Sequence, residues 1–323
     1  MPLNMSHKYK NIKDASNYKG FLWALADLEE GEALYVPKAP SSPGYWECDT
    51  ADPILTGSNK TIFALGGRPL IRPKTYGQTG FYVADNDNAT VENVTLENLA
   101  FYAFSPHNIT ISRKNYNANP ALIVAQHAAH IQVLFCETQG SSDDGLAAYS
   151  VEDLLVLGGK YVGAAGETAF AIELEIENNV DDDLGGITNV RIIGADLSNG
   201  LGGGGVRVNS TTELYADVGG LNQLNDILVA DCTMTLGKHV AATAPNGFRF
   251  AYINGHIAAT GNQIKGGHCQ TGLDAHTMDS LTFTNNHATI DTVDVALWRV
   301  YRNVAGPVKK LIWGNNTPGL VIA

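Results

Sequence analysis

Several short apolar segments of the sequence carry acidic or basic residues at alternate positions, where a β-strand would turn them toward one side. Asp274 and His276 are two positions apart, so on a strand they would share a face and lie about 7 Å from each other. Such a pair could transfer protons, because carboxylates and imidazoles are common general acids and bases. Glu173 is a further acid or base candidate. We predict acid–base chemistry on this face, with these three residues as its catalytic candidates.

A second set of outward residues could bind a sugar chain. Tyr149 and Trp298 would offer flat ring faces to sugar rings, and Arg207 and Arg249 would hold carboxylates or hydroxyls. Asn209 is expected in the same outward row as the two rings. These residues predict a polysaccharide-binding groove. The alternative is a solvated ladder of cross-strand charges, whose pairs contribute only fractions of a kcal/mol.

Two reactions fit these residues, and the sequence leaves the choice open. Hydrolysis of a glycosidic bond generally needs two carboxyl groups about 5 to 9.5 Å apart. Glu173 and Glu175 satisfy that spacing, as does any outward pair two positions apart. A lyase instead needs a base at the C5 proton of the sugar, with Arg or Ca²⁺ to neutralise the uronate. The acidic run at residues 173–183 is a Ca²⁺ candidate, and a solvated acidic loop is the alternative. We expect no bound cofactor and assign no residue to a metal.

The elements that must position these residues form a repeat of paired strands. First strands begin at residues 94, 131, 154, 190, 227, 257 and 281, and each is followed by a corner rich in Gly or Asn and then by a second strand. The alternation has a period of two, with no amphipathic helix in between, which excludes an alternating strand–helix architecture. Stacked coils of parallel strands would bury one continuous core. The inward positions of the second strands predict two ladders: Leu146, Phe170, Val206, Phe248, Leu273 and Val295, and Ala148, Ile172, Val208, Phe250, Ala275 and Leu297.

The N-terminal segment adds two features to this repeat. Residues 21–28 indicate a short helix, and residues 30–37, which end in Tyr35-Val36-Pro37, indicate a strand after it. With these features, residues 20–318 resemble the right-handed parallel β-helix (pectin-lyase-like) superfamily, whose chains typically begin with a capping helix and such a strand. The resemblance implies an all-β fold: a single right-handed parallel β-helix (solenoid) with an N-terminal capping helix. It implies an N-terminal segment and cap at residues 1–40, the β-helix at 41–318 and a C-terminal tail at 319–323. That fold hosts lyases, hydrolases, epimerases, phage spikes and adhesins, so it does not specify a reaction.

One acidic corner resembles a particular branch of the superfamily. Asp143-Asp144-Gly145 is similar to a "DDxxAI" stretch of the polygalacturonase branch, and residues 247–250 are similar to its "GIRIK" stretch. The resemblance implies a catalytic role for Asp143 and Asp144. The Asn-Thr-Asp and His-Gly coils of that branch are missing, and Ala251 stands where its lysine would be, so the branch is not assignable. The alternative is that Asp-Asp-Gly forms an ordinary corner.

Composition limits the partners and the location. Lys plus Arg number 21 against 33 for Asp plus Glu, a net charge of −12, which disfavours nucleic acid and anionic membranes as partners. The apolar runs are far shorter than the 18 or so residues of a membrane-spanning helix. No apolar segment follows the N-terminal lysines, so we expect no Sec signal peptide in this chain and an extracellular or virion location. The four cysteines are too few and too scattered for a disulfide scaffold, and packing in the core is the expected role of Cys136 and Cys232.

An apolar row is expected on the outer side of the first strands. Its members are Leu134, Leu155, Leu157, Ile193 and Leu228. Apolar residues stacked on an outer face must be covered by a loop, by the N-terminal segment or by another subunit. We predict a subunit contact, for which the family resemblance implies a homotrimer. The sequence as a whole favours a phage-associated or secreted protein that binds and cleaves a polysaccharide as a glycoside hydrolase or polysaccharide lyase. The alternative is a non-catalytic virion structural, decoration or adhesion protein that forms trimers.

Overall fold

The computed structural model describes residues 10–39, 41, 44–48, 54–55, 57–73, 81–83, 91–92, 94–97, 99–102, 122–139, 144–163, 170–176, 186–199, 205–210, 223–237, 245–301 and 306–318. Three parts of the sequence predictions lie outside these residues. They are Asp143, the acidic run beyond residue 176 and the C-terminal tail at 319–323.

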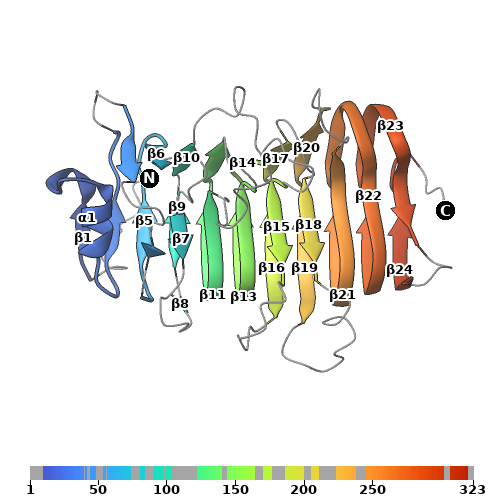
Figure 1. The fold of residues 1–323 in the computed structure, drawn as a ribbon, viewed down its shortest axis with the longest axis horizontal. Coiled ribbons are helices and arrows are strands. Elements are labelled where there is room, and N and C mark those ends of the chain that lie inside the picture. The colour runs from blue at the N-terminus through green and yellow to red at the C-terminus, as the bar shows by residue number, and fades with distance from the viewer. Residues whose placement is uncertain are drawn as a thin grey trace, which may run out of the picture.

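Parallel strands stack side by side along the long axis of the molecule, from α1 (Phe21–Ala26) at the N-terminal end to β23 (His287–Val300) and β24 (Val308–Gly314) at the C-terminal end (Figure 1). Three columns of strands make up the stack, and neighbouring strands in each column pair in parallel. The longest strands bend at corners and therefore contribute to more than one column. In a parallel stack, each inner strand forms backbone hydrogen bonds to both of its neighbours. Its side chains face alternately inward and outward.

The first column consists of β1 (Ile12–Asp14), β2 (Ala33–Tyr35), β5 (Thr61–Phe63), β8 (Val91–Glu92), β9 (Thr95–Glu97), parts of β11 (Ile123–Leu134) and β13 (Leu146–Leu157), β16 (Ile187–Ile193), β19 (Leu224–Ala230), parts of β21 (Asn246–Thr260) and β22 (Gln263–Thr284), and β24 (Val308–Gly314). The second consists of β3 (Trp46–Cys48), β6 (Leu70–Pro73), β10 (Ala100–Tyr102), β12 (Glu137–Gln139), β14 (Lys160–Gly163), β17 (Asp196–Asn199), β20 (Thr233–Leu236), and parts of β22 and β23 (His287–Val300). The third consists of β4 (Ile54–Leu55), β7 (Phe81–Val83), β15 (Ile172–Glu175), β18 (Val206–Asn209) and the remaining parts of β11, β13, β21, β22 and β23.

Helical structure among the described residues is confined to the 3₁₀ turn η2 (Ala15–Asn17) and the short helix α1 (Phe21–Ala26). Phe21, Ala24 and Leu25 of α1 are buried in the same apolar cluster as the strands. A helix therefore forms where residues 21–28 predict one. No helix among the described residues is long and apolar enough to cross a membrane.

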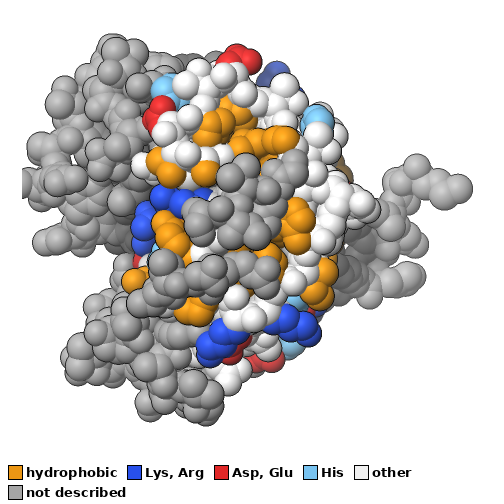
Figure 2. Space-filling model, turned by 90° about the vertical axis from the view of Figure 1, so that its right-hand side faces the viewer, with side chains coloured by type: hydrophobic (Ala, Val, Ile, Leu, Met, Phe, Trp, Pro, Cys, Tyr) orange, Lys and Arg blue, Asp and Glu red, His pale blue; other side chains and the backbone are white. Residues whose placement is uncertain are grey.

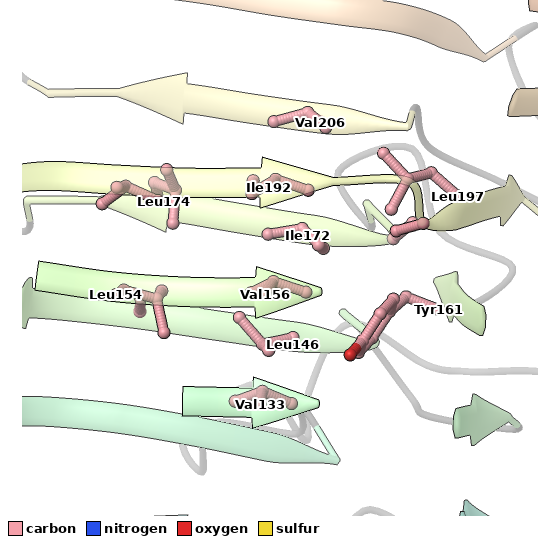
Figure 3. Packing of buried hydrophobic residues seen from close by; sticks show 14 of the residues in the cluster. Val133, Leu146, Leu154, Val156, Tyr161, Ile172, Leu174, Ile192, Leu197 and Val206 are labelled. Carbon is pink, nitrogen blue, oxygen red and sulfur yellow. The ribbon is translucent and has the colours of Figure 1, made fainter. Parts of the chain in front are cut away.

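The inward side chains form one continuous core between the columns. Figure 3 shows aliphatic side chains from successive strands, among them Leu146, Ile172 and Val206, stacked toward the interior. The ring of Tyr161 lies within the same core, and burial raises the pKa of its hydroxyl well above its usual value. Cys136 and Cys232 are buried free thiols, as predicted, and Cys269 is a third.

The register of the second-strand ladder corrects the sequence analysis at two places. Leu146 pairs with Ile172, not with Phe170, because β15 begins two residues later than predicted. In the last coil, Leu273 pairs with Trp298, not with Val295. A bulge opposite residues 269–271, where β23 contains one residue more than β22, accounts for one residue of this three-residue shift and for the exchange of faces. An extra residue turns every following side chain to the opposite face. Val295 is accordingly 51% exposed.

A repeated left-handed backbone position shapes the corner after the first column. The residues with positive φ there are Phe135, Gly158, Gly194, Asp231, Gly261, Asn285 and Asn315. Most are Gly, Asn or Asp, which tolerate this conformation best. In the last three coils, the following residues are Asn262, Asn286 and Asn316, whose side chains hydrogen-bond to one another's backbone and amide groups. We call these three residues the asparagine ladder.

The predicted apolar row on the first column is in fact two rows. Leu134, Leu157 and Ile193 stack on consecutive strands. Leu155 and Leu228 lie in a parallel row and are separated by Arg191. The prediction merged them because positions two apart on one strand face the same side.

At the C-terminal end of the stack, hydrophobic side chains lie among polar and basic ones (Figure 2), and Ile312 of β24 is 47% exposed.

Candidate functional site

Five charged residues on five consecutive strands of the third column form an outward line that we call the charge row. In strand order they are Glu173, Arg207, Arg249, Asp274 and Arg299, each a register partner of the next. Arg249 and Asp274 are thus direct neighbours, as the repeat predicts. Glu173 lies one row away from its predicted place, because the shift of β15 by two residues keeps it outward but sets it opposite Arg207.

The glutamates at the beginning of the charge row are held by Arg207. Its Nη1 lies 2.5 Å from Oε1 of Glu173, and its Nη2 donates to Oε1 of Glu175 at 3.0 Å. The side-chain amide of Asn209 also donates to Oε1 of Glu175 at 3.0 Å. Glu173 is buried as well as ion-paired. The two carboxylates that match the spacing of a hydrolase are therefore both engaged with one guanidinium.

Asp274 is bound by Arg299 at the other end of the row. Nε of Arg299 donates to Oδ1 at 2.9 Å and its Nη2 donates to Oδ2 at 2.7 Å, so both carboxylate oxygens are occupied. This two-pronged contact is the strongest geometry that a guanidinium and a carboxylate can form. The hydrogen bond raises the pKa of Arg299 further. The Arg299 guanidinium also lies 5.4 Å from the centre of the Tyr301 ring.

Arg249 is the cation of the row that is left without a counter-charge. It lies between Arg207 and Asp274, yet it forms no ion pair with any of the described residues. Its Nε is buried and has no hydrogen-bond partner. A guanidinium in this state favours an anionic ligand, because a buried donor without an acceptor is costly.

His276 lies between two tyrosine rings next to Arg249. The imidazole is 5.4 Å from the Tyr252 ring and 5.7 Å from the Tyr301 ring, in nearly perpendicular geometry on both sides. Desolvation by burial lowers the pKa of His276, and the charges of Arg249 and Arg299 lower it further against the opposing effect of Asp274. The imidazole is consequently neutral near pH 7 and able to accept a proton.

The backbone is strained beside this imidazole. Tyr252 and Thr277 have φ angles of 58° and 49°, a left-handed conformation that is unusual for an aromatic or β-branched residue. Thr277 Oγ1 lies 3.1 Å from Nδ1 of His276. Residues held in such conformations gather at functional sites. The strain supports the assignment of this corner as part of the site.

Three predicted site residues are buried and offer little or no surface for binding. Trp298 is only 1% exposed and points inward, with its Nε1 donating to the carbonyl of Pro318. The bulge in β23 is the cause of this error. Tyr149 is 6% exposed, so its ring offers little surface to a sugar. Asp144 is also buried, and its Oδ1 accepts a hydrogen bond from the backbone N–H of Phe170 at 2.6 Å, which is the corner role that the sequence left open.

Three residues of the site were missed from the sequence: Tyr252, Arg299 and Tyr301. Arg299 becomes outward only through the bulge. Tyr252 lies within β21, one residue after Ala251 of the predicted row, and could have been found from that position. Among the described residues, no group of three or more His, Cys, Asp or Glu side chains is arranged to hold a metal ion.

Comparison with known proteins supports the fold. No protein-family model matches the chain, and no curated protein sequence matches it. Among solved structures, ORF18 of Geobacillus virus E2 is similar with a TM-score of 0.55 and 11% identity, and the match covers 89% of this chain and 60% of that one. An alginate lyase from Paenibacillus sp. str. FPU-7 is similar with a TM-score of 0.50 and 11% identity, over 97% of both chains. The chain therefore has the right-handed parallel β-helix fold. It spans less than two thirds of the viral protein.

Proposed function

We propose that the chain binds an anionic polysaccharide along the charge row and cleaves it by proton abstraction. The observation that carries the proposal is the pairing of an uncompensated guanidinium, Arg249, with a neutral imidazole, His276, on neighbouring strands. The cation supplies a receptor for a sugar carboxylate, and the imidazole supplies a base.

The charge row has the extent that a polymer needs. Its five strands are successive neighbours in a sheet, so the row runs for about 19 Å at roughly 4.8 Å per strand. A chain of several sugar units can lie along such a line. Arg207 and Asn209 are already in contact with Glu175, and they present a polar surface for sugar hydroxyls beside the Arg249 site.

The arrangement favours a lyase over a hydrolase. Glu173 and Glu175 are both tied to Arg207, which leaves no pair of free carboxyl groups there for hydrolysis. In the elimination, Arg249 binds the uronate carboxylate and makes the neighbouring C5 proton more acidic. His276 accepts that proton, the C5–H electrons form a C4–C5 double bond, and the C4–O4 bond breaks. The departing O4 takes a proton, for which the Tyr252 and Tyr301 hydroxyls are the candidate donors.

A panel of polyuronates and neutral polysaccharides tests the proposal, with the ultraviolet absorbance of unsaturated products as the readout. We expect turnover of an anionic polymer alone, a loss of kcat of about a hundredfold or more in His276→Gln, and a rise in KM of about tenfold in Arg249→Gln. Arg191→Gln is the matched control, because Arg191 is an ion-paired arginine on another face. No turnover on the whole panel, or equal effects of Arg191→Gln and Arg249→Gln, would contradict the proposal.

A second candidate is a non-catalytic virion or adhesion protein that forms trimers. The stacked side chains of Leu134, Leu157 and Ile193 on the first column favour it, together with Phe135, which is 44% exposed. Light scattering after size-exclusion chromatography tests the assembly. A trimer that Leu157→Glu dissociates and that Thr282→Glu, on the same face, leaves intact would support this candidate. Both candidates imply an extracellular or virion location.

The proposal extends to the N-terminal end of the fold. We take α1 as the cap of a single solenoid, because its apolar face joins the first coil of the core through Phe21 and Leu25. Phe21→Ser is expected to lower the melting temperature by several degrees, since it places a hydroxyl in that core. An unchanged melting temperature would exclude the cap.

A further inference from the structure

Asp274 has an arginine on each side. Arg249 precedes it by one strand and Arg299 follows it by one strand, so the two guanidinium groups start from equivalent positions in the register. The carboxylate nevertheless binds Arg299 alone, with both of its oxygens. Arg299 is also held over the Tyr301 ring, which fixes the guanidinium on the far side of Asp274.

The pairing of Asp274 with Arg299 determines whether Arg249 can bind a ligand. An ion pair between Asp274 and Arg249 would satisfy the guanidinium and occupy the place of a ligand carboxylate. We propose that Arg299 is a positioning residue: by holding both oxygens of Asp274, it prevents this carboxylate from binding Arg249 and keeps the anion site open. The inference rests on the proposed function of Arg249 as a carboxylate receptor.

The same contact controls the charge around His276. The groups that face the imidazole are Asp274 on its own strand, Arg249 and Tyr252 from β21, and Arg299 and Tyr301 that end the next coil. Asp274 is the one negative charge in this set, and Arg299 neutralises it. Without Arg299, the carboxylate would stabilise the protonated imidazole. Arg299 thus keeps the base unprotonated as well as the receptor open.

Four variants test this role: Arg299→Gln, Asp274→Asn, the double variant, and Arg299→Lys. The first readout is the affinity for the polyuronate oligosaccharide that the wild type binds, measured by calorimetry. We expect Arg299→Gln to bind about tenfold more weakly or worse, because Asp274 then turns to Arg249. The double variant is expected to regain the affinity of Asp274→Asn, since no carboxylate is left to compete. A double variant as weak as Arg299→Gln would overturn the proposal.

The second readout needs no polysaccharide, and it separates this inference from the proposed function. An NMR titration follows the His276 ring protons. We expect a higher His276 pKa in Arg299→Gln than in the wild type and a return in the double variant. Arg299→Lys keeps the charge but loses the two-pronged contact, so it should lie between the two. If the wild type binds no polyuronate but the titration behaves as expected, the proposed function fails and the positioning role stands. An unchanged His276 pKa in a folded Arg299→Gln or Arg299→Lys protein would overturn the role itself.

Discussion

The side-chain amide of Asn262 donates to Oδ1 of Asn286 at 2.9 Å, one coil further along the stack, and the two residues are almost fully buried. Oδ1 of Asn286 also accepts from the backbone N–H of Asn262, and its Nδ2 donates to the carbonyl of Ala259. One side chain therefore satisfies backbone groups on both sides of a corner that has no regular strand pairing. The asparagine ladder joins successive corners where hydrogen bonds between strands are interrupted.

Asn286→Ala should consequently destabilise the fold strongly. The change leaves the Asn262 N–H and the Ala259 carbonyl buried without partners, and we expect a loss of about 2 to 4 kcal/mol of unfolding free energy. Asn285→Gly is the matched control, because Asn285 is exposed and has a positive φ that glycine adopts freely. Urea denaturation measures both. Equal losses in the two variants would mean that the ladder contributes little.

Two corner glycines are expected to differ in their response to alanine. Gly159 has a φ of 84°, and an added Cβ would lie 2.2 Å from the Cys136 carbonyl oxygen. Gly194 has a φ of 64°, but no atom lies within 4 Å of its added Cβ. We expect about 1 kcal/mol of destabilisation for Gly194→Ala, from backbone strain alone, and about 3 kcal/mol for Gly159→Ala, from strain and overlap together. Thermal denaturation tests the order, and similar melting temperatures would refute it.

The stability of the protein should depend on pH through His276. Its folded-state pKa is lowered from 6.5, chiefly by desolvation. Between the lowered pKa and 6.5, the native state binds fewer protons at this site than the unfolded chain, so protonation favours unfolding. The contribution is fully present above pH 6.5 and is lost as the pH falls through the folded-state pKa. Urea denaturation between about pH 8 and about pH 5 should show a weaker pH dependence in His276→Gln than in the wild type. Parallel profiles for the two proteins would argue against it.

Trp298 is expected to act as a core residue. Its ring packs edge-on against Phe283, with ring centres 5.1 Å apart, and lies near Trp313. Truncation in Trp298→Ala should cost about 3 to 5 kcal/mol, because it leaves a large cavity. Val295→Ala, three residues earlier on the same strand but half exposed, should change stability by less than about 0.5 kcal/mol. Chemical denaturation compares the two, and a tolerant Trp298→Ala variant would show that the ring lies outside the core.

The sequence predicts the stacked parallel strands well because the pattern behind them is repeated many times. Alternation recurs in each coil, so an error in one copy does not obscure the others. Arg249 and Asp274 are neighbours in the structure, as their places in the repeat require. The right-handed parallel β-helix expected from the resemblance is likewise the fold that the structural comparison supports.

The site was predicted less completely, because a register shift of one residue changes which side chains face outward. A shift by two residues in β15 kept Glu173 outward but moved it against Arg207, where it is buried in an ion pair. In β23, the register differs from the predicted one by an odd number of residues. The inward and outward faces of the strand are therefore exchanged, so that Trp298 points inward and Arg299 outward. The bulge that causes this exchange has no glycine or proline to mark it in the sequence of β23.

The members of the charge row come from separate coils, and this makes the row a ruler with fixed divisions. Backbone pairing sets each interval, so the distance between neighbouring positions grows only in whole increments of about 4.8 Å. Arg207 and Arg249 are one division apart, while Arg249 and Arg299 are two apart. Gain or loss of an entire coil would lengthen or shorten the ruler by one division while leaving the interior stacking unchanged. Ligands of different repeat length could then be matched without any new interior contacts.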